Sequence, residues 1–178
     1  MTTNRSAKLT RTLQRHLLRV EAGAIGGLIG AVAVALFFFV QGATHLHPLA
    51  VPSALTSAWV GGVSGSSAAA ARVGSDAVNI LQVLVYTVLH LVAFAVVGMS
   101  AAFALDGSRF WRSVWGGAAY VGGACTALLY IVSWITDTPL APQVLGLGRV
   151  LFANMLAGAI IGVALYMVEH GDHPNVAV

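Results

Sequence analysis

One long apolar segment, from Asn79 to Ala104, constrains this chain more than any other part of the sequence. Because about 20 residues of α-helix cross the hydrocarbon core of a bilayer, the segment is long enough to span a membrane. Four of its polar side chains recur at helical spacing and predict one stripe along the helix: Asn79, Gln82, Tyr86 and His90. Polar groups inside a membrane face other helices or a cavity rather than lipid. We therefore expect further helices to pack around this stripe.

Three further apolar segments are similarly long, which gives four predicted spans, at about 22–43, 79–104, 110–135 and 147–168. Charged residues make up only 8% of the 178 residues, whereas soluble domains carry about 25%. The first apolar segment is too long for the core of a signal peptide, so we expect it to remain as the first span. The sequence predicts an all-α membrane protein with a single domain, residues 1–178, folded as a bundle of four transmembrane helices.

The basic residues predict how this bundle is oriented. Five of the nine precede the first span, and Arg109 and Arg112 lie in the loop before the third. The connections on the opposite side hold only Arg72 and Arg149. Since cytoplasmic segments are enriched in Lys and Arg, we expect both termini on the cytoplasmic side of a bacterial inner membrane. The same distribution accounts for the net charge of +3 without a nucleic-acid partner.

The segment before the first span, residues 1–20, is basic and amphipathic. Its leucines and arginines each recur every four residues, on different faces of a helix: Leu9, Leu13 and Leu17, and Arg11, Arg15 and Arg19. Such a segment forms either a short helix on the inner leaflet or a cytoplasmic extension of the first span. Its basic residues are expected to attract anionic lipid headgroups. An arm that binds RNA or protein is a less favoured alternative.

The longest predicted connection, residues 44–77, joins the first two spans on the outer side and includes a Gly/Ser/Ala-rich strap at 61–71. Connections of this length are commonly functional or interfacial. His45 and His47 resemble a metal-binding pair, with Asp76 as a further candidate. Structural zinc takes four ligands, so two imidazoles do not complete a site and we expect no metal here.

Glycines at four-residue spacing predict where helices approach closely. Two overlapping G-x-x-x-G pairs lie in the first span, and further packing glycines are predicted in the third and fourth: Gly23 with Gly27, Gly26 with Gly30, Gly123 between Ala119 and Ala127, and Gly158 with Gly162. Small residues let backbones approach where lipid removes the hydrophobic drive for association. These faces pack either within the chain or against a partner subunit, and we expect a partner to dock through the first and fourth spans.

The spans also carry polar residues that a rise of 1.5 Å per residue places at comparable depth in the outer half of the bundle. The predicted intramembrane cluster is Gln41, Gln82, Tyr86, His90, Thr126, Tyr130 and Asn154. One interpretation is interhelical hydrogen bonding, which contributes about 0.6 kcal/mol per bond. The other interpretation is a cofactor site.

A cofactor site would depend on His90, because it is the only histidine deep within a predicted span. A neutral imidazole ligates haem iron, and the same lone pair suits the magnesium of a chlorophyll-type pigment. His90 and Tyr86 together offer hydrogen bonds to a quinone headgroup. A bis-histidine haem is not expected, because no second histidine lies at that depth.

Three stretches of the sequence resemble a group of uncharacterised bacterial integral membrane proteins with four spans. They are AGAIGGLIGAVAVALFFFV in the first span, HPLAVPSALTSA after it and YTVLHLVAF in the second span. The resemblance implies the four-span architecture and no particular function.

The sequence contains no G-x-S-x-G, H-E-x-x-H or G-x-x-x-x-G-K motif, and we expect no enzymatic activity. The leading hypothesis is a non-catalytic accessory subunit of a larger bacterial membrane complex of the energy-converting class, respiratory or photosynthetic. Its partners would be the lipid bilayer and the other membrane subunits. The alternatives are an electron-transfer protein that binds haem, pigment or quinone at His90, and a small permease.

Overall fold

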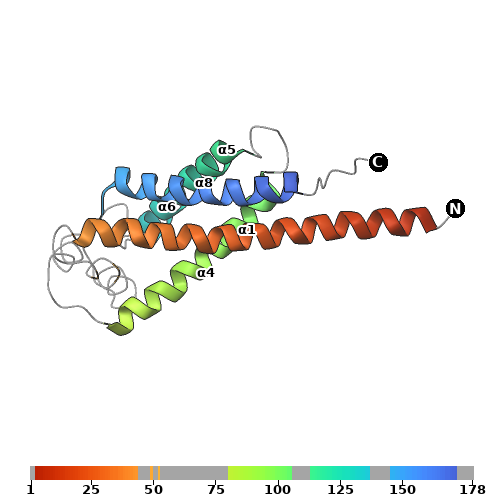
Figure 1. Cartoon of the computed structure of the whole chain (residues 1–178). Helices are drawn as coiled ribbons and strands as arrows, with labels where there is room; N and C mark the ends of the chain where they lie inside the picture. Colours follow the sequence, from red (N-terminus) through yellow and green to blue (C-terminus); the bar gives the residue numbers. More distant parts are fainter. Residues whose placement is uncertain are drawn as a thin grey trace.

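The computed structural model of this chain describes residues 3–43, 49, 52, 80–105, 113–136 and 145–171. Helices account for nearly all of these residues (Figure 1). Apart from Leu49 and Pro52, the connection between the first two spans lies outside the described residues, with its 61–71 strap and with His45 and His47. The loop that holds Arg109 and Arg112 lies outside them as well.

The described part of the chain forms four helical spans. Three of them are single helices: α1 (Thr3–Ala43), α4 (Ile80–Ala104) and α8 (Leu147–Gly171). The third span consists of three consecutive pieces: α5 (Val114–Tyr120), the π-helix η1 (Val121–Cys125) and α6 (Thr126–Thr136). Each span contains a stretch long and apolar enough to cross a membrane. The predicted all-α, multi-pass membrane architecture is thereby confirmed.

The first helix is much longer than the predicted span. α1 runs without interruption for 41 residues, which at 1.5 Å per residue is about 60 Å. A bilayer core is about 30 Å thick, so α1 is longer than one crossing requires, and its N-terminal end projects beyond the other helices (Figure 1). Of the two alternatives for residues 1–20, the structure therefore shows a helix continuous with the first span.

The bundle is tight at one end and open at the other. α1 packs against both α4 and α8, and α8 packs in turn against α5 and η1. At the end of the bundle where α4 ends and α5 begins, Ser100 Oγ of α4 lies 3.4 Å from the Tyr120 hydroxyl of α5. Toward Ile80, α4 leans away from the other spans (Figure 1). The core therefore follows α1 and α8, where Ala31, Ala157 and Ile161 are completely inaccessible.

Local sequence explains where the third and fourth spans begin. The side chain of Ser113 caps α5 by accepting a hydrogen bond from the backbone N–H of Gly116, at 3.3 Å. Before α8, Gly146 has a φ of 88°, a left-handed conformation that favours glycine. Its carbonyl oxygen accepts a hydrogen bond from the N–H of Val150 at 3.3 Å, which starts the helix.

The third span differs from the single continuous helix that the sequence predicts. η1 interrupts it at its middle, and a π-turn inserts an extra residue that changes which side chains face a neighbouring helix. α5 and η1 pack along α8, whereas α6 makes few contacts with it. On α6 the side chains of Leu128 and Ile131 are exposed, and that of Trp134 is 84% exposed.

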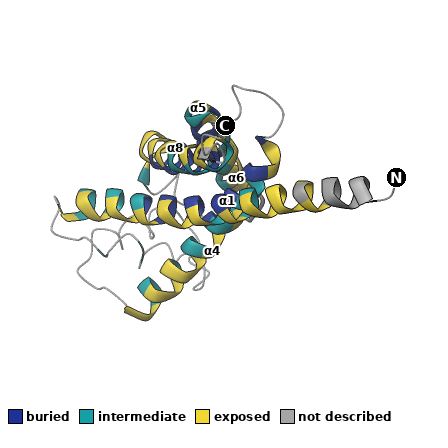
Figure 2. Ribbon diagram, turned by 45° about the vertical axis from the view of Figure 1, so that its right-hand side comes forward, coloured by how far each residue is buried: buried dark blue, intermediate teal, exposed yellow. Residues whose placement is uncertain are grey.

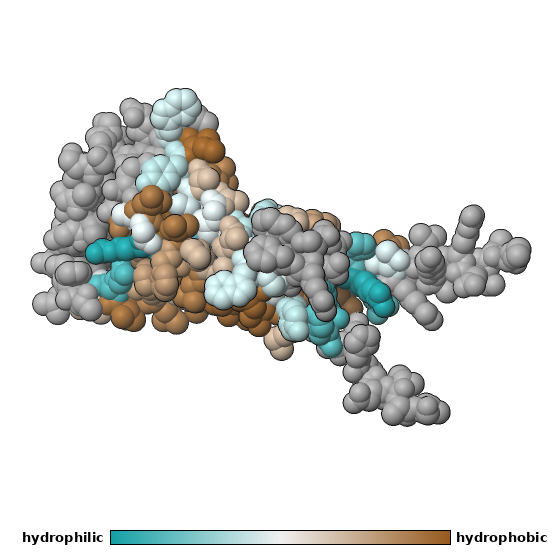
Figure 3. Space-filling view, turned by 90° about the horizontal axis from the view of Figure 1, so that it is seen from above, coloured by the Kyte–Doolittle hydropathy of each residue, from teal (hydrophilic) through white to brown (hydrophobic). Residues whose placement is uncertain are grey.

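Apolar side chains form most of the described surface. Figure 2 shows α4 exposed along much of its length, and Figure 3 shows apolar residues spread over the described middle of the molecule. Leu81, Val88 and Val96 are among those exposed on α4. Extended apolar surface of this kind indicates contact with lipid or with other membrane-embedded protein.

Candidate functional site

The two glycine pairs of α1 face two different helices of the same chain. Gly23 and Gly27 lie against α4, so closely that a Cβ added at Gly27 would collide with the backbone carbonyl of Phe94. Gly26 and Gly30 lie against α8, where an added Cβ would be 2.9 Å from Ala164 Cβ and 3.1 Å from Ala157 Cβ, respectively. Both pairs therefore create room for backbone contact within the bundle.

The glycines of α8 make a third close contact, with the first half of the third span. A Cβ added at Gly158 would collide with the backbone carbonyl of Gly117, and one added at Gly162 would lie 3.0 Å from the carbonyl oxygen of Ser113. Sequence reasoning missed the partner glycines of these contacts, Gly98 on α4 and Gly117 on α5. A glycine in a long apolar helix weakens that helix and is a usable signal of close packing.

Gly123 is the exception among the predicted packing glycines. It lies in η1 and is exposed, and no described atom lies within 4 Å of a Cβ added to it. Ala119 and Ala127, four residues to either side, are exposed as well. We call these three residues the open small-residue face of the third span. The glycine next to it in sequence, Gly122, is buried against Met155 of α8.

His90 binds α1 through a hydrogen bond. Its Nε2 donates to the carbonyl oxygen of Ala31 at 3.2 Å, and because a carbonyl only accepts, the proton resides on Nε2. The imidazole stacks on Tyr86, with ring centroids 5.3 Å apart, and its centroid lies 4.7 Å from that of Phe94. His90 is thus a hydrogen-bond donor at the α1–α4 interface, supported by aromatic rings one turn before and one turn after it.

This arrangement limits what His90 offers a cofactor. Ligation of haem iron or of a pigment's magnesium through Nε2 would require the bond to Ala31 to break, which would remove this polar contact between α4 and α1. Nδ1 remains as the nitrogen with a lone pair. The arrangement supports a packing role for His90 and Tyr86 better than a ligand-binding one.

The predicted polar cluster is divided between different interfaces. At a different interface from that of His90, Asn154 of α8 donates through Nδ2 to Thr126 Oγ1 at 3.0 Å, and both residues are buried. Thr126 is the first residue of α6, so the bond joins α8 to the third span where the two begin to diverge. Gln41 and Gln82 are partly buried, and Tyr130 is exposed.

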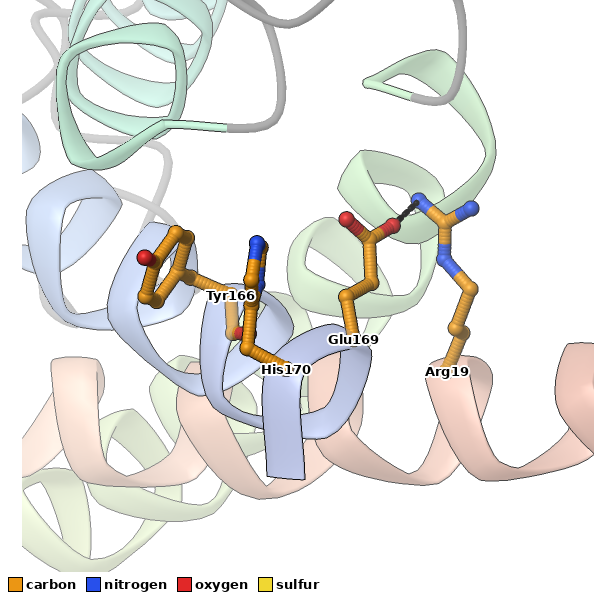
Figure 4. A network of polar contacts seen from close by, with 4 residues as sticks. All are labelled: Arg19, Tyr166, Glu169 and His170. Carbon is orange, nitrogen blue, oxygen red and sulfur yellow. Dashed lines mark hydrogen bonds and ion pairs between the residues drawn. The ribbon is translucent and has the colours of Figure 1, made fainter. Parts of the chain in front are cut away.

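Charged residues form a further interhelical contact that the sequence patterns did not reveal. Arg19 Nη2 of α1 lies 3.3 Å from Glu169 Oε1 of α8, and the side chains are 12% and 17% exposed, respectively. One residue further on, His170 Nδ1 donates to the carbonyl oxygen of Tyr166 at 3.0 Å and stacks on its ring (Figure 4). Arg19 and Glu169 each lie next to the end of a predicted span, and this shared position is a signal from which the pair could have been predicted.

Comparison of the chain with protein-family models, with curated proteins and with solved structures found no match in any of the three. In the part of the chain that the structure describes, His, Cys, Asp and Glu side chains form no group of three that could hold a metal ion. Function must therefore be inferred from the interfaces themselves.

Proposed function

We propose that this chain is a non-catalytic accessory subunit of a larger bacterial membrane complex, of the respiratory or photosynthetic energy-converting class. The observation that carries the proposal is the open small-residue face of the third span, Ala119, Gly123 and Ala127. Small residues at four-residue spacing allow close helix association in lipid. The other small-residue faces described above are filled by helices of this chain, whereas on this face no described atom lies within 4 Å of a Cβ added to Gly123.

The route of docking differs from the sequence-based expectation. We expected a partner to meet the glycines of the first and fourth spans, but those glycines contact α4, α8 and α5 of the same chain. α1 and α8 are the central helices of the bundle, so their glycine faces are occupied by helices of the same chain. The third span lies at the edge of the bundle and retains one face.

The proposed orientation places both termini in the cytoplasm and the connection 44–77 outside. Four spans bring both termini to the same side, as Figure 1 shows for the ends of α1 and α8. Five of the nine basic residues precede the first span (Arg5, Lys8, Arg11, Arg15 and Arg19), and Arg109 and Arg112 belong in sequence to the connection between the second and third spans. Because basic residues favour the cytoplasmic side, a bacterial inner membrane is the proposed location. Fusions of a reporter enzyme to the C-terminus and to residue 60 test this orientation.

The test of function is purification in a mild detergent from the native membrane, with co-purifying chains identified by mass spectrometry. Larger redox or photosynthetic subunits are expected in fixed ratio with the wild-type chain and are expected to be lost from Gly123→Leu. Ala93→Leu is the matched control, because it adds a similar bulk at an exposed position of α4. Recovery of the wild-type chain alone would refute the proposal. Equal recovery of partners with both variants would show that the third span is not the docking face.

A further inference from the structure

The N-terminal part of α1 projects beyond the other helices of the bundle (Figure 1). The Arg19–Glu169 pair joins the last turn of α8 to α1, and charged groups are placed at the ends of spans because the hydrocarbon core disfavours them. From that level α1 continues back to Thr3, a further distance of about 24 Å. Figures 1 and 2 show this part running straight on from the span.

A leucine stripe runs along the projecting helix, and two of its members lack cover by any described residue. Leu13 and Leu17 are 63% and 69% exposed, and Leu9 occupies the next position in the same register, one turn earlier. Leu13 lies about 9 Å along the helix from Arg19, whereas the headgroup layer is only about 5–8 Å thick on each side. By the same rise, Leu17 lies within that layer, about 3 Å from Arg19, and Leu13 and Leu9 lie beyond it. Beyond the lipid, exposed leucines favour burial against another surface.

The positive charge of the projecting helix indicates what kind of partner surface can cover its leucines. Residues 1–20 contain Arg5, Lys8, Arg11, Arg15 and Arg19 and no acidic residue. A second copy in parallel would bring these like charges together, which destabilises helix pairs. An acidic partner complements them. The membrane surface is a less suitable cover, because this helix continues along the axis of the span. A helix covers its apolar face with lipid only when it lies in the membrane plane.

We propose that residues 3–18 of α1 form a docking helix for an acidic amphipathic helix of a partner protein in the aqueous phase. The partner's apolar positions cover Leu9, Leu13 and Leu17, and its carboxylates flank the stripe opposite basic residues such as Arg15. This inference extends the proposed accessory role, because it gives the subunit a second contact outside the membrane. It uses none of the residues of the open small-residue face, so the two contacts can fail separately.

The test is site-specific photocross-linking in the full chain, expressed in its native cells and analysed in isolated membranes. A photoreactive amino acid replaces Leu13 in one variant and Gln14, exposed on a different face, in the matched control. The Leu13 variant is expected to cross-link to one helix-forming segment rich in Asp and Glu, at several times the yield of the Gln14 variant. Arg15→Gln or added salt is expected to reduce that yield by up to about fivefold, as for a solvent-exposed ion pair.

Three results would overturn this inference. Adducts with lipid alone would assign the helix to the membrane surface, and adducts with another copy of this chain would make it a dimerisation helix. Equal yields from positions 13 and 14 would show that the leucine stripe is not a docking face. The outcome is distinguishable from that of the membrane contact. Gly123→Leu is expected to leave the cross-link from position 13 in place. If position 13 gives no protein cross-link while the membrane subunits still co-purify with the wild-type chain, the docking helix is refuted and the membrane contact is not.

Discussion

The first and third spans both carry glycines on two faces, but only the first has both faces filled by its own chain. The two glycine pairs of α1 meet α4 and α8. In the third span, Gly117 and Gly122 meet α8, whereas Gly123 faces open space among the described residues. The comparison teaches that a small-residue motif marks a helix that can be approached closely. It does not reveal whether the approaching helix belongs to the same chain.

The difference has a physical origin in the course of the third span. Lipid is as apolar as leucine, so helices in a membrane associate through close packing and hydrogen bonds rather than hydrophobic burial. α1 lies between two neighbours and uses Gly23, Gly26, Gly27 and Gly30 for such packing. In the third span the π-turn places Gly122 against α8 and the adjacent Gly123 on the outside. One helix therefore has an internal face and an outward one.

The largest predicted effect is at the filled face of α1. Gly27→Leu places side-chain atoms where the backbone of α4 now lies, and overpacking against backbone is expected to lower the free energy of unfolding by about 3 kcal/mol or more. The measurement is unfolding of the purified protein in detergent micelles by titration with a denaturing detergent. Gly148→Leu is the control, because a Cβ added there meets no described atom within 4 Å. Equal stability of the two variants would mean that α1 and α4 can separate at little cost.

A smaller effect is expected where the third span remains attached to α8. Asn154→Val removes the donor to Thr126 Oγ1 and puts an apolar side chain of similar size in its place. The expected loss is about 1 kcal/mol, the scale of interhelical hydrogen bonds in membranes. Thr126→Val and the double variant complete a double-mutant cycle. Additive losses would show that the 3.0 Å contact contributes nothing specific to the α8–α6 junction.

His90 sharpens the comparison at the α1–α4 interface, where a polar contact adds to glycine packing. His90→Phe keeps an aromatic ring between Tyr86 and Phe94 but removes the bond to Ala31, so a loss of about 0.6 kcal/mol is expected. The same variant tests the electron-transfer alternative through a reduced-minus-oxidised absorption spectrum of the purified complex. We expect identical spectra for wild type and variant. A Soret band that His90→Phe abolishes would instead assign His90 to haem.

The helices themselves could be predicted from the sequence because each depends on a local property. Apolar length and composition gave the spans, and the observed α4 and α8 begin at or within one residue of the predicted starts, at Ile80 and Leu147. The leucine and arginine register of residues 1–20 predicted a helix, but whether it bends onto the membrane or continues α1 depends on its surroundings. For that reason the sequence left two alternatives.

The interfaces could be predicted only in part, because they depend on which helices become neighbours. Comparable depth suggested that His90 and Asn154 belong to one cluster, yet depth along a helix says nothing about the direction in which a side chain points. In the structure they lie on different interfaces, those with α1 and α6. The π-turn at Val121–Cys125 has no recognisable periodicity of its own. The outward direction of Gly123 therefore became visible only with the fold.

The smallest predicted change in stability is at the open small-residue face, and it separates a packing role from a docking role. Gly123→Leu adds a side chain where no described atom lies within 4 Å, so the isolated chain should unfold within about 0.5 kcal/mol of wild type. The variant even gains helix propensity relative to glycine. Loss of partners from a variant that remains this stable would locate the effect in association, because the fold would be unchanged. A loss of stability as large as that of Gly27→Leu would show instead that Gly123 packs within the chain, and the difference between the first and third spans would disappear.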